Sequence, residues 1–220
     1  MLLSIDTCGA LGTVALVRLD NEKLSLLAQT ELPGKTYSAR LVPTIRELLA
    51  THNVALTEIA TIVVTNGPGS FTGIRIGLST AKGLAEPNSI PILAVSRLAA
   101  LAHKAGTSAS VLDASRHEFY LGEYSTAAPS ESLLSRDAFA QKAALLGPQL
   151  AISEASLVTE APKATRVDPP TALDALYFAL PRLRARDFDD PLLLDGNYLR
   201  RSDAEIFSKP GARPVPNPPA

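Results

Sequence analysis

Several residue types are scarce or missing in this chain, and each absence excludes a class of protein. The 220 residues include no tryptophan, one cysteine and three histidines. Because Cys8 has no partner within the chain, a disulfide-stapled scaffold is excluded and a reducing compartment is favoured. His52, His103 and His117 are scattered along the sequence at spacings that do not suit a shared metal ion, which argues against zinc or iron catalysis.

Strong net charge and long apolar runs are also absent. The formal net charge is -1, which argues against a protein that binds nucleic acid alone through a basic surface. No apolar stretch approaches the roughly 20 residues that cross a bilayer, and the first residues lack the basic region of a signal peptide. With 46% hydrophobic and 20% charged residues, the composition is that of a globular protein, which we expect to be cytoplasmic.

The most informative segment that is present is the glycine-rich run from Asn66 to Gly77. It follows an apolar stretch at residues 60–65 and precedes a helical pattern that ends near Ala85, so it predicts a strand, a tight turn and a helix. A P-loop would need a lysine that this run lacks, and Thr72 stands where a dinucleotide fingerprint has its third glycine. Two interpretations stay open: a structural corner, or a direct contact of free helix N–H groups with phosphate.

Small residues occupy both the turn and one side of the helix that follows it. The turn consists of Gly67, Pro68, Gly69 and Ser70, with Ser70 expected to cap the helix. The helix row consists of Gly73, Gly77 and Thr80. Glycine inside a helix costs about 1 kcal/mol relative to alanine. We therefore expect another backbone to pack very close to this row.

A preceding helix, predicted from Thr36 to His52, carries an apolar stripe of its own. The stripe consists of Tyr37, Leu41, Ile45, Leu48 and Leu49. A helix needs one face for its sheet, and both helices have apolar or glycine surface beyond that. This predicts a second packing partner for the helix pair, and the alternative is that the two helices simply pack on each other.

The predicted order of elements indicates an α/β fold. Strands are expected at 2–5, 13–18, 24–30, 60–65 and 91–95, and helices at 36–52, 71–85 and 97–104. Three strands followed by alternating helices and strands form a mixed sheet with helices on its faces. The same order is the half-unit of the actin-like, ribonuclease-H-like (ASKHA) architecture, in which two halves face each other across a nucleotide cleft.

The second half of the chain restarts this pattern and then shortens it. Residues 111–114 and the alternating stretch 118–124 parallel the first strand and its hairpin. Further helices are expected at 138–146 and 172–184, and short strands at 150–153 and 192–194. We predict two lobes with mixed sheets, at residues 1–103 and 104–207, the second lobe reduced, and a disordered proline-rich tail at 208–220.

Asp6 and Thr7, and Asp113 at the matching point of the second half, are candidate nucleotide-site residues. In an actin-like fold they would stand at phosphate-loop and metal-water positions. The simpler alternative is that aspartate is common where a strand turns into a hairpin, and we expect a remnant of a site. Cys8 lies in no basic cluster and is interpreted as a small buried apolar residue.

At this point the motifs resemble those of the bacterial TsaB (YeaZ) family. The similarity lies in Leu3–Thr7, Ser38–Pro43, Gly67–Gly77, Ala81–Ala85, Leu112–Ala114 with Arg116, and Tyr198–Arg201. It is nearly continuous in the first half of the chain and occurs in islands in the second half.

The resemblance implies a non-catalytic paralogue of the enzyme TsaD, with an actin-like fold. TsaD transfers threonylcarbamoyl to N6 of adenosine 37 in tRNAs that read codons starting with A. The resemblance further implies a TsaD-like partner bound through the first two helices, a TsaE-like ATPase joining them, only indirect contact with tRNA, and a homodimer when the chain is alone. It implies no cofactor and leaves open a nucleotide only at the subunit junction. The partner-binding residues it implies are Tyr37, Arg40, Leu41, Ile45, Phe71, Gly73, Ile74, Gly77, Thr80 and Ala81.

One departure from the catalytic paralogue supports the non-catalytic role. That enzyme holds its metal with two histidines four residues apart, and the similarity places Arg97 and Leu101 at these two positions. Neither side chain ligates a metal at neutral pH. The competing hypothesis is a stand-alone ATP-dependent kinase or acyltransferase that uses Asp6 and Asp113.

Overall fold

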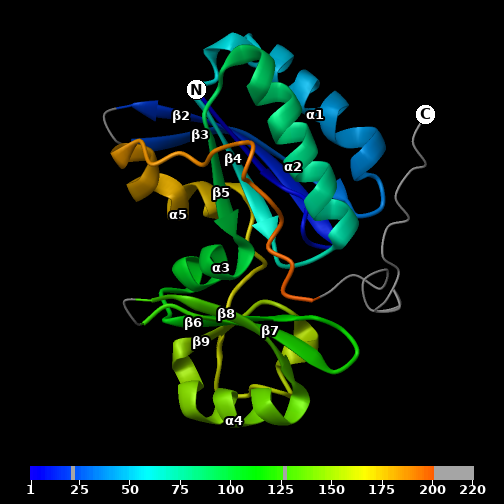
Figure 1. The fold of residues 1–220 in the computed structure, drawn as a ribbon, viewed down its shortest axis with the longest axis vertical. Coiled ribbons are helices and arrows are strands. Elements are labelled where there is room, and N and C mark those ends of the chain that lie inside the picture. Colours follow the sequence, from blue (N-terminus) through cyan, green and yellow to red (C-terminus); the bar gives the residue numbers. More distant parts are fainter. Residues whose placement is uncertain (21–22, 126–127, 201–220) are drawn as a thin grey trace, which may run out of the picture.

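The computed structural model describes residues 1–20, 23–125 and 128–200, which form two lobes, each built on a five-stranded mixed sheet (Figure 1). The predicted tail at 208–220 lies outside the described residues. The strands are β1 (Leu2–Asp6), β2 (Leu11–Asp20), β3 (Lys23–Pro33), β4 (Thr61–Gly67), β5 (Ile92–Ser96), β6 (Ala109–Asp113), β7 (Glu118–Glu123), β8 (Ser130–Ser135), β9 (Leu150–Ile152) and β10 (Thr165–Arg166). The helices are α1 (Tyr37–Thr51), α2 (Phe71–Ala85), α3 (Arg97–Ala105), α4 (Arg136–Leu146) and α5 (Ala172–Ala185). Among the described residues, none of these helices has the length and apolarity to cross a membrane.

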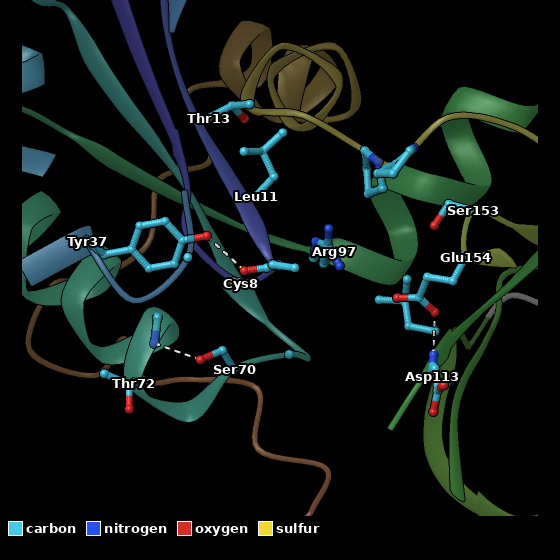
Figure 2. A pocket seen from close by; sticks show the side chains of 18 of the residues that line it. Cys8, Leu11, Thr13, Tyr37, Ser70, Thr72, Arg97, Asp113, Ser153 and Glu154 are labelled. Atoms are coloured by element: carbon cyan, nitrogen blue, oxygen red, sulfur yellow. Dashed lines mark hydrogen bonds between the residues drawn. The ribbon is translucent and has the colours of Figure 1, made fainter. Parts of the chain in front are cut away.

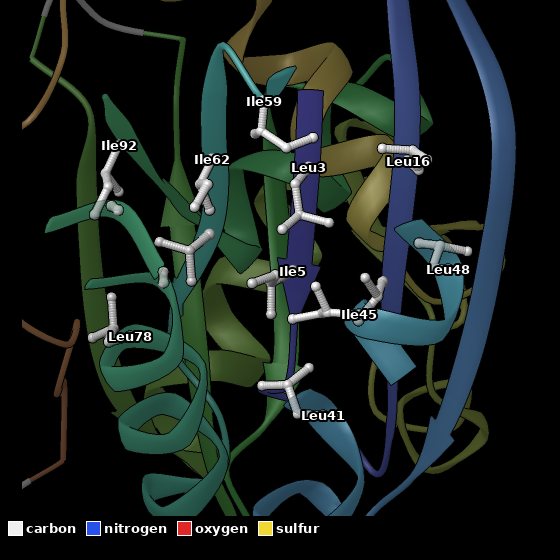
Figure 3. Packing of buried hydrophobic residues seen from close by; sticks show 14 of the residues in the cluster. Leu3, Ile5, Leu16, Leu41, Ile45, Leu48, Ile59, Ile62, Leu78 and Ile92 are labelled. Atoms are coloured by element: carbon white, nitrogen blue, oxygen red, sulfur yellow. The ribbon is translucent and has the colours of Figure 1, made fainter. Parts of the chain in front are cut away.

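The first sheet has the strand order β3-β2-β1-β4-β5. β1 pairs antiparallel with β2 and parallel with β4, so Ile5 lies between Val14 and Val64. Every residue of β1 is buried because helices cover both faces of the sheet. On one face, Leu3 and Ile5 pack against the apolar stripe of α1 and against α2 (Figure 3).

The second sheet repeats the first. Its order, β10-β9-β6-β7-β8, places a β-meander and two parallel strands in the same relative positions as in the first sheet. α4 occupies the place that α1 has in the first lobe. Between β9 and β10, where the first lobe has α2, only a single 3-10 turn, Ala155–Leu157, is found. The predicted repeat and the reduction of the second lobe are therefore confirmed.

The two lobes exchange helices. α3 follows β5 in the chain but packs mainly on β6, β7 and β9, with further contacts to β4 and β5, and α5 follows β10 but packs on the strands of the first sheet. The two helices also contact each other, between the sheets (Figure 1). The predicted boundary at residue 103 lies inside α3, and neither α3 nor α5 packs only on the sheet that it follows in the chain.

Residues 187–200 form a strap that runs from the first lobe to the second. Asp189 N donates to Ile92 O at 3.0 Å, and Asn197 N donates to Asn66 O at 2.7 Å. Near its end the ring of Tyr198 stacks on Phe71, with centroids 5.0 Å apart. The short strand predicted at 192–194 is wrong. Leu192 and Leu193 lie in a turn, 89% and 82% exposed, and none of the described strands pairs with them.

The glycine row of α2 faces the end of β1. A Cβ atom at Gly73 would lie 1.9 Å from the Thr7 carbonyl oxygen, and one at Gly77 would lie 2.4 Å from Thr7 Oγ1. Thr7 Oγ1 donates a hydrogen bond to Gly73 O at 2.7 Å. The close backbone that the glycines predict is therefore present, but it belongs to this chain. The expectation that the row receives a foreign helix is corrected.

Replacing Gly73 by alanine should unfold or strongly destabilise the isolated chain. Its methyl group would meet backbone that cannot move aside, and we expect a loss of at least about 3 kcal/mol in the free energy of unfolding, the upper part of the range for overpacking. Urea unfolding followed by circular dichroism measures this loss.

The matched control lies in the same helix. A Cβ at Gly83 has nothing within 4 Å and points to solvent, so Gly83→Ala should stabilise the chain by about 1 kcal/mol through helix propensity alone. Equal stability of the Gly73→Ala variant and the unmodified chain would contradict the described packing.

Candidate functional site: the cleft between the lobes

A cleft of about 1340 Å³ lies between the two lobes. The first lobe contributes the β1–β2 loop, the glycine turn with the start of α2, and the start of α3. The second lobe contributes the end of β6 and the segment after β9, and the residues before α5 close one side. Figure 2 shows Cys8, Tyr37, Ser70 and Arg97 on the side opposite Asp113 and Glu154.

Gly69 and Ser70 of the predicted glycine turn line this cleft. Gly67 and Gly69 have φ angles of 113° and 155°, which side chains rarely permit. The Gly67–Pro68 peptide bond is cis. Ser70 caps α2 as predicted, accepting from Gly73 N at 3.2 Å, while its own N–H donates to Cys8 O at 2.9 Å. The turn is therefore a structural corner that holds α2 against the β1–β2 loop.

Asp6 lies behind the cleft wall in a buried ion pair with Arg97. Arg97 Nε lies 3.3 Å from Asp6 Oδ2, and the two side chains are only 8% and 2% exposed. The other carboxylate oxygen accepts from Cys8 N at 2.9 Å. Burial alone would lower the pKa of Arg97, but the Asp6 charge raises it above its ordinary value, so the guanidinium stays charged.

Sequence reasoning noted Arg97 only as a residue that is not histidine. The available clue was Ser96, the predicted cap of the third helix, which accepts from Ala99 N at 3.4 Å. Ser96 ends β5 and caps α3, so the side chain of Arg97 begins at the carboxyl end of β5, beside the end of the parallel strand β4. β4 alone separates β5 from β1, so a long side chain at Arg97 can reach Asp6.

Two further groups surround this pair. The Cys8 thiol is buried and donates to Thr65 O at 3.3 Å. Burial, followed by the negative charge of Asp6, raises its pKa well above the ordinary value, so it stays protonated and is a poor nucleophile, as the sequence predicts. The Tyr37 hydroxyl donates to Gly9 O at 2.8 Å and anchors the β1–β2 loop to α1.

On the opposite wall, Asp113 closes its own hairpin. Its carboxylate accepts from Ser115 N at 2.7 Å and from Ser156 Oγ at 3.1 Å. Its backbone N–H donates to Glu154 Oε2 at 2.6 Å. One oxygen of Asp113 thus closes the local turn, which is the simpler of the two interpretations offered by the sequence, and the other holds the segment after β9.

The residues of the cleft do not fit the metal-bound nucleotide that the actin-like fold implies. Asp6 is already neutralised by Arg97. Among the lining cations, Lys104 pairs with Asp174 at 2.9 Å and Arg200 pairs with Glu118. No group of three or more acidic, histidine or cysteine side chains in the described part of the chain is arranged to hold a metal ion. Three of the four cations that line the cleft, Arg97, Lys104 and Arg200, are thus held by carboxylates of the chain itself, and Lys35 is the fourth.

The predicted partner-binding residues lie mostly in the chain's own core. The buried ones are Tyr37, Leu41, Ile45, Gly73, Ile74, Gly77 and Ala81. Arg40 is exposed, and Phe71 and Thr80 are half-buried. The buried residues cannot form a partner surface in this conformation, because they already pack against the first sheet and against each other. The outward side of α1 instead presents Arg40 and Val42, the latter 45% exposed.

Two repeated lobes, a β-β-β-α-β-α order and loops converging on one cleft define an actin-like (ASKHA) protein. Within that class, residues 28–180 match the family model of TsaD, tRNA N6-adenosine threonylcarbamoyltransferase. The chain belongs to this family, on its TsaB/YeaZ branch.

Relatives on that branch include proteins named tRNA threonylcarbamoyladenosine biosynthesis protein TsaB. The one from Bacillus subtilis is 38% identical over 127 residues, 56% of this chain and 54% of the relative. The one from Escherichia coli is 35% identical over 129 residues, 56% of this chain and 54% of the relative. The match therefore spans about half the length of these relatives.

Solved structures resemble the chain over more of its length. A Pseudomonas aeruginosa protein described as similar to peptidase YeaZ superposes with a TM-score of 0.74 at 29% identity, covering 90% of this chain and 99% of that one. YeaZ from the same organism superposes with a TM-score of 0.72 at 28% identity and the same coverage.

The Tyr37 anchor should make stability depend on pH in the alkaline range. Burial, followed by the Asp6 charge, raises the pKa of Tyr37 to about 12, whereas an unfolded tyrosine ionises near pH 10. Between these values the unfolded chain loses a proton that the folded chain keeps, so this contribution, complete below about pH 10, is lost as the pH rises through 12.

The Tyr37→Phe variant tests this contribution. It should be about 1 kcal/mol less stable at neutral pH, through the lost hydrogen bond, and its free energy of unfolding should fall less steeply above pH 10. Urea unfolding at several pH values gives the free energy of unfolding against pH. Equal slopes above pH 10 for the variant and the unmodified chain would contradict the role assigned to Tyr37.

Proposed function

We propose that this chain is a non-catalytic subunit of the complex that adds threonylcarbamoyl to N6 of adenosine 37 in tRNAs that read codons starting with A. The observation that carries the proposal is the family match over residues 28–180, together with relatives named as biosynthesis proteins for this modification. In the complex, a TsaD-like paralogue performs the transfer and a TsaE-like ATPase joins the pair.

The engagement of the cleft residues supports the non-catalytic part. A stand-alone kinase or acyltransferase of this fold would need Asp6 and Asp113 free to act on a metal or a substrate. Instead, the carboxylate of Asp6 and the carboxylate of Asp113 each accept hydrogen bonds from the chain itself. The charge of Asp6 is also neutralised by Arg97. Cys8 is protonated and buried, so it supplies no nucleophile either.

The partner surface in this proposal is the outward side of α1 and α2. The two helices lie side by side on the face of the first sheet that is turned away from α5 (Figure 1). Their buried sides complete the core of the chain, while Ala39, Arg40 and Val42 of α1 and Thr72 and Arg75 of α2 stay exposed. A TsaD-like partner, built on the same fold, would present its own helix pair to this surface. A second copy of the chain would use the same surface when the partner is absent, and tRNA would be contacted only through the complex.

An acidic substitution at Val42 should weaken this association. Val42→Asp would place a charge in a desolvated helix–helix contact without changing the core of the isolated chain, and we expect at least about a tenfold loss of affinity, or 1.4 kcal/mol. Binding of the purified chain to an immobilised TsaD-like paralogue, measured by biolayer interferometry, gives the affinity.

The control is Leu145→Asp. Leu145 is also an exposed aliphatic residue on a helix, 84% exposed on α4 of the other lobe, so this variant should bind like the unmodified chain. Equal losses for both variants would point to a general effect of charge, and full binding by Val42→Asp would move the interface to another surface.

The non-catalytic role has its own test. A modification assay with the TsaD-like and TsaE-like partners should require this chain, whereas the chain alone with ATP and tRNA should form no product. Modification of RNA or steady hydrolysis of ATP by the isolated chain would refute the proposal.

A further inference from the structure

We propose that the Arg97 guanidinium is a built-in cation of the cleft, which takes the place of a divalent metal beside Asp6 and thereby determines which ligands the cleft excludes. The inference concerns the isolated chain and goes beyond the proposed function, on which it does not rest.

The carboxylate of Asp6 is fully used within the chain. It stands at the carboxyl end of β1, where an actin-like fold would place a metal-bound water. One oxygen accepts from Cys8 N at 2.9 Å, and the other lies 3.3 Å from Arg97 Nε. The negative charge is therefore balanced at a site that is almost closed to solvent, with the Asp6 side chain only 2% exposed.

The guanidinium also fills the space in front of the β1–β2 loop. A Cβ atom at Gly9 would lie 2.5 Å from an Arg97 terminal nitrogen and 3.1 Å from Cζ. Loop backbone and guanidinium are thus in direct contact, with no room for a hydrated ion between them. A divalent ion keeps several oxygen ligands, often including water, so it needs more space than this contact leaves.

A rigid element holds Arg97 in this position. It is the first residue of α3, after the cap Ser96, whose hydroxyl also donates to Glu131 of the second lobe. Leu98 and Leu101 of the same helix have no exposed surface and lie in the core shared with the second sheet. The base of the side chain therefore cannot swing away without loss of contacts in the core between the lobes.

A second carboxylate faces the guanidinium from the other lobe. Glu154 lies across the cleft, on the same side as Asp113 (Figure 2), and its charge acts on Arg97 in addition to that of Asp6. Without Arg97, Asp6 would lose its counter-charge, and Glu154, whose Oε2 accepts from Asp113 N at 2.6 Å, would add a second negative charge on the opposite wall. Oxygen ligands of this kind suit hard divalent cations. Removal of one side chain should therefore convert a cleft that excludes such cations into one that binds them.

The experiment measures Mn²⁺ binding to the purified full chain by electron paramagnetic resonance of the free ion, together with the thermal unfolding midpoint. The unmodified chain should bind no Mn²⁺ at the cleft, and its midpoint should not respond beyond an ionic-strength control with NaCl. The Arg97→Ala variant should unfold at a lower temperature, bind Mn²⁺ at one site at least about tenfold more tightly than any weak binding elsewhere on the unmodified chain, and regain part of its midpoint in a saturable way.

A double variant shows whether the carboxylate is the ligand. Asp6→Asn combined with Arg97→Ala removes both charges, so its midpoint should lie above that of Arg97→Ala and should not respond to Mn²⁺. If Arg97→Ala fails to fold without metal, the same titration on Arg97→Gln, which keeps a hydrogen-bond donor, gives the result.

Two outcomes would overturn the inference. One is a folded Arg97→Ala or Arg97→Gln variant that binds Mn²⁺ no better than the unmodified chain. The other is an unmodified chain that binds Mn²⁺ at one site, with loss of that binding in Asp6→Asn. Both outcomes leave the partner-binding experiment unaffected, so failure of this inference is distinguishable from failure of the proposed function.

Discussion

The second helix approaches the end of the first strand so closely that no side chain fits between them, and the geometry of the cleft depends on that approach. The Thr7 hydroxyl donates to the carbonyl of Gly73, and the N–H of Ser70 donates to the carbonyl of Cys8, so one side-chain and one backbone hydrogen bond join the two segments. The helix propensity that the glycines forgo is offset by this contact and by the packing of Ile74 and Leu78 beneath it. With α2 held here, the glycine turn and the β1–β2 loop together form one wall of the cleft.

The opposite wall of the cleft comes from the second sheet, which repeats the strand order of the first. Among its described residues, the second lobe lacks a counterpart of α2. Where the first lobe has α2, the second has a single turn at Ala155–Leu157. The loops that meet at the cleft are thus the equivalent loops of two related halves, yet they differ in chemistry. Asp6 is paired with a cation from a third element, whereas Asp113 is occupied with closing its own hairpin. The chain therefore keeps the cleft, but the carboxylates of Asp6 and Asp113 bind other groups of the same chain.

Most of the fold could be predicted from the sequence, because the apolar periodicity and the Ser caps are local. The helices from Tyr37, Phe71 and Arg97 begin within a residue of their predicted starts. β8, with the sequence Ser-Glu-Ser-Leu-Leu-Ser, has too little alternation to be predicted and is a strand because β7 offers it an edge. The run at 192–194 is apolar enough for a strand but has no edge to join.

The site was predicted less well, for a physical reason. A glycine row indicates that some backbone lies close, but nothing in the spacing says whose, and the structure assigns it to Thr7. The apolar residues of α1 and α2 were assigned to a partner, although Leu41 and Ile45 are needed to cover the chain's own sheet. The Asp6–Arg97 pair joins residues that are distant in sequence, so only the strand order reveals it. Which family the chain belongs to was predictable, because it depends on motifs and not on contacts.

The exchange of α3 and α5 has a consequence for how the polypeptide is made. Ala15, Val17 and Val63 on one face of the first sheet are covered by α5, which leaves the ribosome only after the entire second sheet. A nascent chain that stops short of residue 172 therefore carries a bare apolar surface on a sheet that is otherwise finished. Such an exposed surface is what chaperones recognise, so the N-terminal half cannot be expected to survive as an independent fragment.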